Sequence, residues 1–226
     1  MSQNRLAHKR VLVTQADAYM GPITCEVFAE QGAEVIADTS DLTEPSRAAA
    51  LIEEVGTVDV LVANLAAPAH LGVAAAEMPD DLWQTMFDVM VHPLHRLTKA
   101  VLPQMMARQQ GKILVYGSAT GVKGMAGITA YSSARHAQVG YVRSTGIEIA
   151  PHNIQMNLIA QNFVENPIYF PPAFTQTPAF QELLKNVPAG RLATAREDAM
   201  FGVFLASNES DFFVGQAIPF SGGWAQ

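Results

Sequence analysis

The sequence has little cysteine, little charge and no long apolar run. Cys25 is the only cysteine, which excludes an internal disulfide and favours a reducing, cytoplasmic compartment. Charged residues make up 15% of the 226 residues and the net charge is −7, so we expect no nucleic-acid or anionic-membrane partner. No apolar stretch approaches the roughly 18 residues of a membrane span. The polar start, residues 1–10, is not expected to be a signal peptide.

Glycines are also missing from the first turn of the chain. The apolar residues 11–14 predict a strand, and Gly21 is the first glycine after it. A strand-to-helix turn that binds a dinucleotide usually carries several glycines, because the backbone must approach the pyrophosphate closely. Here Gln15 and Tyr19 bring side chains into the turn, and Asp17 adds a negative charge. We therefore expect no dinucleotide in the usual pose.

The alternation of apolar runs and helical patterns predicts an α/β fold. We expect one Rossmann-like domain over residues 1–226, with a doubly wound parallel sheet and helices on both faces. The expected strands are 11–14, 34–37, 58–62, 112–116, 154–159 and 216–220. The expected helices are 21–31, 45–55, 80–108, 130–150, 178–186 and 196–207.

Local signals mark several ends of these elements. Gly32 and Gly56 are expected to end the first two helices. Thr194 and Glu197 have the spacing of a capping box at the start of the last helix. Residues 160–177, rich in proline and aromatics, are expected to form a long functional loop.

Three side chains near the middle of the chain are the main candidates for catalysis. Ser118 follows the apolar run 112–117, so it is expected at the carboxyl end of a buried strand, where open α/β sheets bind ligands. Tyr131 and Arg135 are four residues apart and share one face of a helix. The charged guanidinium favours the ionised phenol. A serine donor, a tyrosine base and a cation can move a proton on or off a substrate oxygen.

The chain resembles the halohydrin dehalogenases over nearly its whole length. The resemblance is carried by the Ser118, Tyr131 and Arg135 spacing, by Tyr19 in the turn where dehydrogenases have glycines, and by the loop Asn162-Phe163-Val164. These enzymes are relatives of the short-chain dehydrogenases. The resemblance implies Ser118, Tyr131 and Arg135 as catalytic residues, and neither a cofactor nor a metal. It also implies conversion of vicinal haloalcohols to epoxide, halide and proton, and epoxide opening by azide, cyanide or nitrite.

The resemblance further implies a small anion pocket. The ring of Tyr19 would form one wall, and backbone N–H groups around Asn162, Phe163 and Val164 would bind the halide. The substrate pocket is then expected to include Met125, Tyr169 and Phe170. It also implies a homotetramer, a dimer of dimers, through helices 80–108 and 130–150; the other interpretation buries these helices within one subunit.

Two positions depart from related patterns. Met90 stands where dehydrogenases carry an asparagine that relays protons, and Leu65 stands where some dehalogenases carry an aspartate beside the arginine. The sequence therefore does not indicate how Arg135 is held or how a proton leaves Tyr131.

Two alternative functions stay open. An atypical NAD(P)-dependent dehydrogenase is favoured by Asp38, which could contact a ribose at the end of the second strand. A dinucleotide-sensing or scaffold protein on the same fold is the non-enzymatic alternative, and the complete Ser-Tyr-Arg set argues against it. The six histidines lack metal-binding spacing, so we expect no metal.

Overall fold

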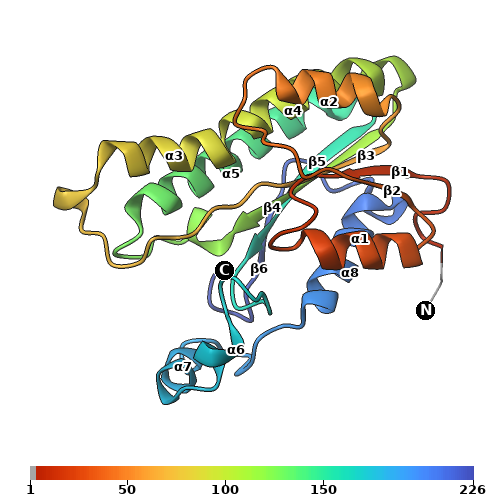
Figure 1. Cartoon of the computed structure of the whole chain (residues 1–226). Coiled ribbons are helices and arrows are strands. Elements are labelled where there is room, and N and C mark those ends of the chain that lie inside the picture. Colours follow the sequence, from red (N-terminus) through yellow and green to blue (C-terminus); the bar gives the residue numbers. More distant parts are fainter. Residues whose placement is uncertain (1–3) are drawn as a thin grey trace.

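The strands form one parallel sheet in the computed structural model, which describes residues 4–226 (Figure 1). Its six strands lie in the order β2-β1-β3-β4-β5-β6. Their bounds are β1 Arg10–Val13, β2 Glu34–Ala37, β3 Val60–Asn64, β4 Gly111–Ser118, β5 Ile154–Gln161 and β6 Ala217–Phe220. Residues 1–3, part of the predicted domain 1–226 and of its polar start, lie outside the described residues. The predicted Rossmann-like parallel sheet is confirmed.

Helices cover both faces of this sheet (Figure 1). On one face lie α1 (Gly21–Glu30) and α8 (Ala195–Ala206), which share a core with side chains such as Phe28 and Val203. The other face is covered by α2 (Arg47–Val55), α4 (His92–Arg108) and α5 (Thr129–Ile149). Every residue of β3 and β4 is buried, as expected for central strands between two helical layers.

The prediction of one helix over residues 80–108 is wrong. The segment forms α3 (Asp80–Met90) and α4, which meet at Val91. Pro93 lies in the first turn of α4, and proline has no N–H to continue the hydrogen bonding of a preceding helix. The carbonyl of Met90 instead accepts a hydrogen bond from Gln138 Nε2 on α5 at 2.9 Å. The break therefore links α3 to the helix that carries the catalytic candidates.

Other boundaries shift by smaller amounts. The strand expected at 58–62 runs two residues later, because its pairing with β4 continues to Asn64. The loop expected at 160–177 contains the last two residues of β5 and the short helix α6 (Pro172–Thr175), and α7 (Pro178–Leu184) follows it. Gly32 and Gly56 adopt positive φ beside the helix ends, and the Thr194–Glu197 capping box is present.

The strand order fixes where ligands can bind. The chain adds β2 on one side of β1 and β3 on the other, so the order reverses between β1 and β3. In such sheets the ligand crevice lies beyond the carboxyl ends of the strands at this point. Only α1, β2 and α2 lie between β1 and β3. Within residues 4–226, no helix combines the length and the apolar character needed to cross a membrane.

Candidate active site

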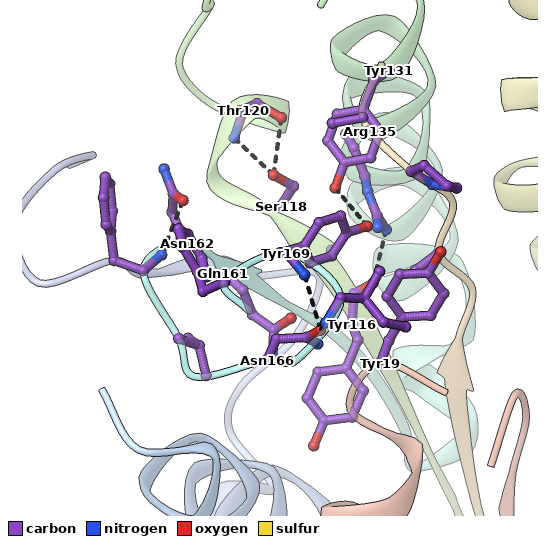
Figure 2. Close-up of a pocket in the computed structure, with 18 of the residues that line it drawn as sticks. Tyr19, Tyr116, Ser118, Thr120, Tyr131, Arg135, Gln161, Asn162, Asn166 and Tyr169 are labelled. Atoms are coloured by element: carbon purple, nitrogen blue, oxygen red, sulfur yellow. Dashed lines mark hydrogen bonds between the residues drawn. The ribbon is translucent and has the colours of Figure 1, made fainter. Parts of the chain in front are cut away.

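Ser118 is the last residue of β4 and is almost completely buried. Its hydroxyl lies 2.9 Å from the Thr120 hydroxyl and accepts a hydrogen bond from the Thr120 N–H at 3.2 Å (Figure 2). The strand end and the short helical turn after it therefore hold this hydroxyl in place. Thr120 was not among the predicted site residues, although it lies only two residues beyond Ser118.

Tyr131 and Arg135 lie on one face of α5, as their spacing predicts. The guanidinium carbon of Arg135 lies 5.0 Å from the centre of the Tyr131 ring. Both side chains are buried and line the same cavity as Ser118. The three catalytic candidates are thus brought together by β4 and α5 (Figure 2).

Main-chain carbonyls and one amide hold Arg135. Its Nη1 donates to the carbonyls of Leu65 and Tyr116, both at 3.0 Å, and to Gln138 Oε1 at 2.9 Å. An aspartate at position 65 is therefore not needed to hold the arginine. Burial lowers the pKa of Arg135, but the nearby phenols of Tyr131 and Tyr169 outweigh it, so its pKa is raised and the cation persists.

Tyr169 reaches the three catalytic candidates from the loop after β5. Its hydroxyl lies 3.4 Å from the Tyr131 hydroxyl and donates to the Ala67 carbonyl at 2.7 Å. Its ring packs against that of Tyr19, with 5.3 Å between the ring centres. Burial, with a further contribution from Tyr131, raises the pKa of both Tyr19 and Tyr169, so both side chains stay protonated at neutral pH.

Side chains fill the turn between β1 and α1. Gln15 donates through Nε2 to the Ala66 carbonyl at 3.2 Å and accepts from the Ala66 N–H at 2.9 Å. Asn64 Nδ2 binds two carbonyls of the turn, those of Gln15 and Ala18. Gln15 and Tyr19 have φ of 43° and 53°, in the region that favours glycine. The turn is therefore tied to the loop after β3 rather than open toward a ligand.

The anion nest expected at residues 162–164 is only partly available. The N–H of Asn162 donates to the Phe220 carbonyl at 3.1 Å, and the N–H of Phe163 donates to Asn162 Oδ1 at 2.9 Å. Among the described residues, the Val164 N–H has no such partner. Phe163 has a φ of 55°, so the turn has the shape that makes nests but keeps two of its three donors occupied.

Gln161, which ends β5, connects the cavity to a buried carboxylate. Its Nε2 donates to Asp198 Oδ2 on α8 at 2.6 Å. Asp198 is fully buried, and within residues 4–226 its Oδ1 has no hydrogen-bond partner. Burial raises the pKa of Asp198 to about 7. Nothing in the local sequence indicates this pair, whose members are 37 positions apart.

All predicted site residues line one cavity of about 370 Å³. They are Ser118, Tyr131, Arg135, Tyr19, Asn162, Phe163, Val164, Met125, Tyr169 and Phe170. Leu183 and Trp224 also line it and were not predicted. Trp224 is placed by Lys123, whose Nζ donates to its carbonyl at 2.6 Å and lies 4.5 Å from the centre of its ring.

No group of three or more metal-binding side chains gathers in the described part of the chain. The shortest contact between a histidine and a carboxylate joins His92 to Asp88 at 3.1 Å, and both side chains are exposed.

The fold is that of the short-chain dehydrogenase/reductase class of enzymes. The chain belongs to this superfamily: the family model described as enoyl-(acyl carrier protein) reductase matches residues 9–225.

The similar proteins are described either as oxidoreductases or as a dehalogenation enzyme. A 3-oxoacyl-(acyl-carrier-protein) reductase of Vibrio harveyi is 32% identical, over 96% of this chain and 98% of its own. A solved structure described as a dehalogenation enzyme superposes with a TM-score of 0.90 at 31% identity, covering 97% of this chain and 99% of the other. A gluconate 5-dehydrogenase from Burkholderia cenocepacia J2315, in complex with NADP and tartrate, gives 0.89 at 26%, covering 98% and 97%.

Proposed function

We propose that this protein is a cofactor-independent halohydrin dehalogenase, a carbon–halide lyase. The observation that carries the proposal is one cavity that is lined by Ser118, Tyr131 and Arg135 and also by the turn after β1. In this turn the side chains of Gln15 and Tyr19 occupy the space where dinucleotide-binding relatives have glycines. The likeness to a structure described as a dehalogenation enzyme supports it.

The proposed reaction begins with a proton transfer. The Tyr131 phenolate takes the hydroxyl proton of a vicinal haloalcohol, while Ser118 donates a hydrogen bond to the same oxygen. Arg135, buried and cationic, stabilises the phenolate. The alkoxide then attacks the neighbouring carbon, the carbon–halogen bond breaks, and the halide leaves with the bonding electrons. The products are an epoxide, a halide and a proton, and no hydride moves.

In this proposal the halide leaves toward Tyr19 and the loop after β5. The Val164 N–H has no internal hydrogen-bond partner among the described residues, so it can donate to an anion. Phe163 also lines the cavity, and donors are more effective at a site that excludes water. Epoxide opening by azide, cyanide or nitrite would use the same site in reverse.

The residues of the first turn do not fit a nicotinamide dinucleotide in the usual pose. A pyrophosphate would have to bind at the turn that the Gln15 side chain ties to Ala66. The Tyr19 ring also occupies this turn, at a position where the backbone would need to approach the pyrophosphate without a side chain between them. The contacts of Gln15 and Tyr19 support a site without a cofactor. Asp38 is buried, and one of its oxygens accepts the Ser40 hydroxyl at 2.7 Å while the other has no hydrogen-bond partner among the described residues.

A reductase is the second candidate. The curated relatives described as 3-oxoacyl-(acyl-carrier-protein) reductases favour it, and so does an acidic residue, Asp38, directly after β2. Calorimetry with NAD(H) and NADP(H) separates the two functions. A micromolar dissociation constant would favour the reductase.

The direct test of the dehalogenase is release of halide and proton from short vicinal chloro- and bromoalcohols, with no cofactor added. The control is Tyr131→Phe, which removes one oxygen and keeps the ring. The proposal fails if the purified protein releases no halide from any of these alcohols between neutral and alkaline pH. A non-enzymatic sensor or scaffold role would then be the better account.

We also propose a homotetramer assembled through α3, α4 and α5. Trp83 and Phe87 form an aromatic pair on α3, with 5.2 Å between ring centres, and Trp83 is exposed. Ile147 on α5 is 70% exposed. A second subunit would bury these apolar side chains. Light scattering on the purified protein and on Ile147→Glu tests the assembly, and we expect a smaller species for the variant.

A further inference from the structure

The hydroxyl of Tyr169 makes one strong and one weak contact, with two different oxygen atoms. It donates to the Ala67 carbonyl at 2.7 Å, a short and strong hydrogen bond. It also lies 3.4 Å from the Tyr131 hydroxyl, which is long for two hydroxyls and indicates a weak contact in this state. Figure 2 shows the two phenols meeting end to end beside Arg135.

The loop after β5 fixes Tyr169 from its own backbone. Asn166 is buried, and its Oδ1 accepts the N–H groups of Ile168 at 2.9 Å and of Tyr169 at 3.3 Å. The N–H of Phe170 donates to the Asn166 carbonyl at 2.7 Å. These bonds hold the loop in one tight turn, and the stacking of Tyr169 on Tyr19 fixes the ring. The hydroxyl hydrogen can still rotate.

We propose that Tyr169 is a positioning residue that stabilises the ionised form of Tyr131 by turning its hydroxyl hydrogen from Ala67 to the Tyr131 oxygen. In the neutral state Tyr131 donates to Tyr169, which donates to Ala67. In the ionised state Tyr169 donates to the phenolate, and the Ala67 carbonyl gives up this partner. No proton passes between the two residues. The proposal rests on the proposed function only in taking Tyr131 as the proton acceptor.

The groups around the pair permit this rearrangement. Arg135 on α5 and Tyr19 in the turn after β1 are the other titratable side chains that face it. Burial and the neighbouring Tyr131 raise the pKa of Tyr169 well above its ordinary value, so Tyr169 keeps its hydrogen while Tyr131 is ionised. A hydrogen bond to a charged oxygen is stronger than one to a neutral carbonyl, and this favours rotation of the Tyr169 hydroxyl hydrogen toward the Tyr131 phenolate.

The test is a pH titration of tyrosinate absorbance in the near ultraviolet, without substrate. The signal of Tyr131 is the difference between each protein and the same protein carrying Tyr131→Phe. We expect Tyr169→Phe to move this transition to higher pH by roughly one unit, the effect of losing one charge-assisted hydrogen bond. The pH–rate profile of halide release should move by a similar amount, with the rate recovering at high pH.

Tyr141→Phe is the matched control, because Tyr141 is half-buried like Tyr169 but lies farther along α5, beside His95 and away from this pair. It should leave the Tyr131 transition in place. Tyr169→Phe keeps the ring that packs on Tyr19, and Tyr169→Met gives a second variant without the hydroxyl. An unmoved Tyr131 transition in both variants overturns the proposal. Because the titration uses no substrate, its outcome is independent of whether the protein releases halide.

Discussion

A Cβ atom at Gly21 would lie 2.2 Å from the carbonyl oxygen of Gln15. The clash is with backbone, so it cannot be relieved by a side-chain rotation. Gly21 is thus required by the packing of α1 against the turn before it, whether or not a phosphate binds there. We expect Gly21→Ala to destabilise the fold by about 1–3 kcal/mol, measured by denaturant unfolding. An unchanged free energy of unfolding would contradict this explanation.

The buried Asp198 should make stability depend on pH. Its pKa rises from 3.8 to about 7 on folding, so the folded state favours the protonated form. Its contribution is fully present below about pH 4 and is lost as the pH rises through about 7. The shift corresponds to at most about 4 kcal/mol. Asp198→Asn should therefore raise the free energy of unfolding at pH 8, and raise it less at pH 5.

Asp211→Asn is a suitable control for that measurement, because Asp211 is exposed and its partner Lys112 lies elsewhere on the sheet. It removes an exposed carboxylate and leaves the buried Gln161–Asp198 pair unchanged. If Asp198→Asn is less stable than the parent at pH 8, then Asp198 is ionised and stabilised there by contacts beyond Gln161.

The catalytic group should respond in a graded way to substitution. Tyr131→Phe removes the base and should reduce halide release by roughly 10³-fold or more. Ser118→Ala removes a positioning donor and should reduce it less, since the base remains. Steady-state rates and melting temperatures together separate catalysis from folding. Equal losses in both variants, with intact folds, would contradict the assigned roles.

The hold on Arg135 gives a further test. Gln138 binds Arg135 Nη1 and the Met90 carbonyl at the same time, so it couples the arginine to the break between α3 and α4. Gln138→Leu should remove one of the three acceptors of Arg135 Nη1 and the side-chain donor to the Met90 carbonyl. We expect it to destabilise the fold by about 1–3 kcal/mol and to lower halide release as well. Gln138→Glu would pair with the cation, and should retain more activity. Identical behaviour of the two variants would contradict the role of Gln138.

Much of the site was predictable because it is local in the chain. Ser118 ends a strand, and Tyr131 and Arg135 share one face of a helix, so short spacings fix their relation. Pro93 could have predicted the break between α3 and α4. The prediction of one continuous helix neglected that proline has no N–H to donate a helical hydrogen bond.

Other features depend on contacts between distant segments. Gln161 on β5 and Asp198 on α8 meet only through the tertiary fold, and Trp224 reaches the cavity from the far end of the chain. The Asn162 N–H is occupied by the Phe220 carbonyl on β6, a partner that local spacing does not reveal. Periodicity reports which side of an element is buried, but not which side chains meet there.

The side chains in the turn between β1 and α1 give two related predictions. Gln15 and Tyr19 both have positive φ, so glycine fits the backbone at either position without strain. Tyr19→Gly should remove one wall of the proposed halide site. We expect weaker product inhibition by chloride and bromide together with slower turnover, measured by initial rates at increasing salt. Sodium sulfate at matched ionic strength controls for screening.

The double variant Gln15→Gly, Tyr19→Gly carries the same argument to the cofactor. It removes the side chain that ties the turn to Ala66 and the ring that packs on Tyr169. Backbone N–H groups at the start of α1 would then be accessible to a pyrophosphate. Calorimetry should detect NADH or NADPH binding that the parent lacks. Equal affinity in parent and variant would mean that these two side chains do not exclude the dinucleotide, and the reductase function would regain support.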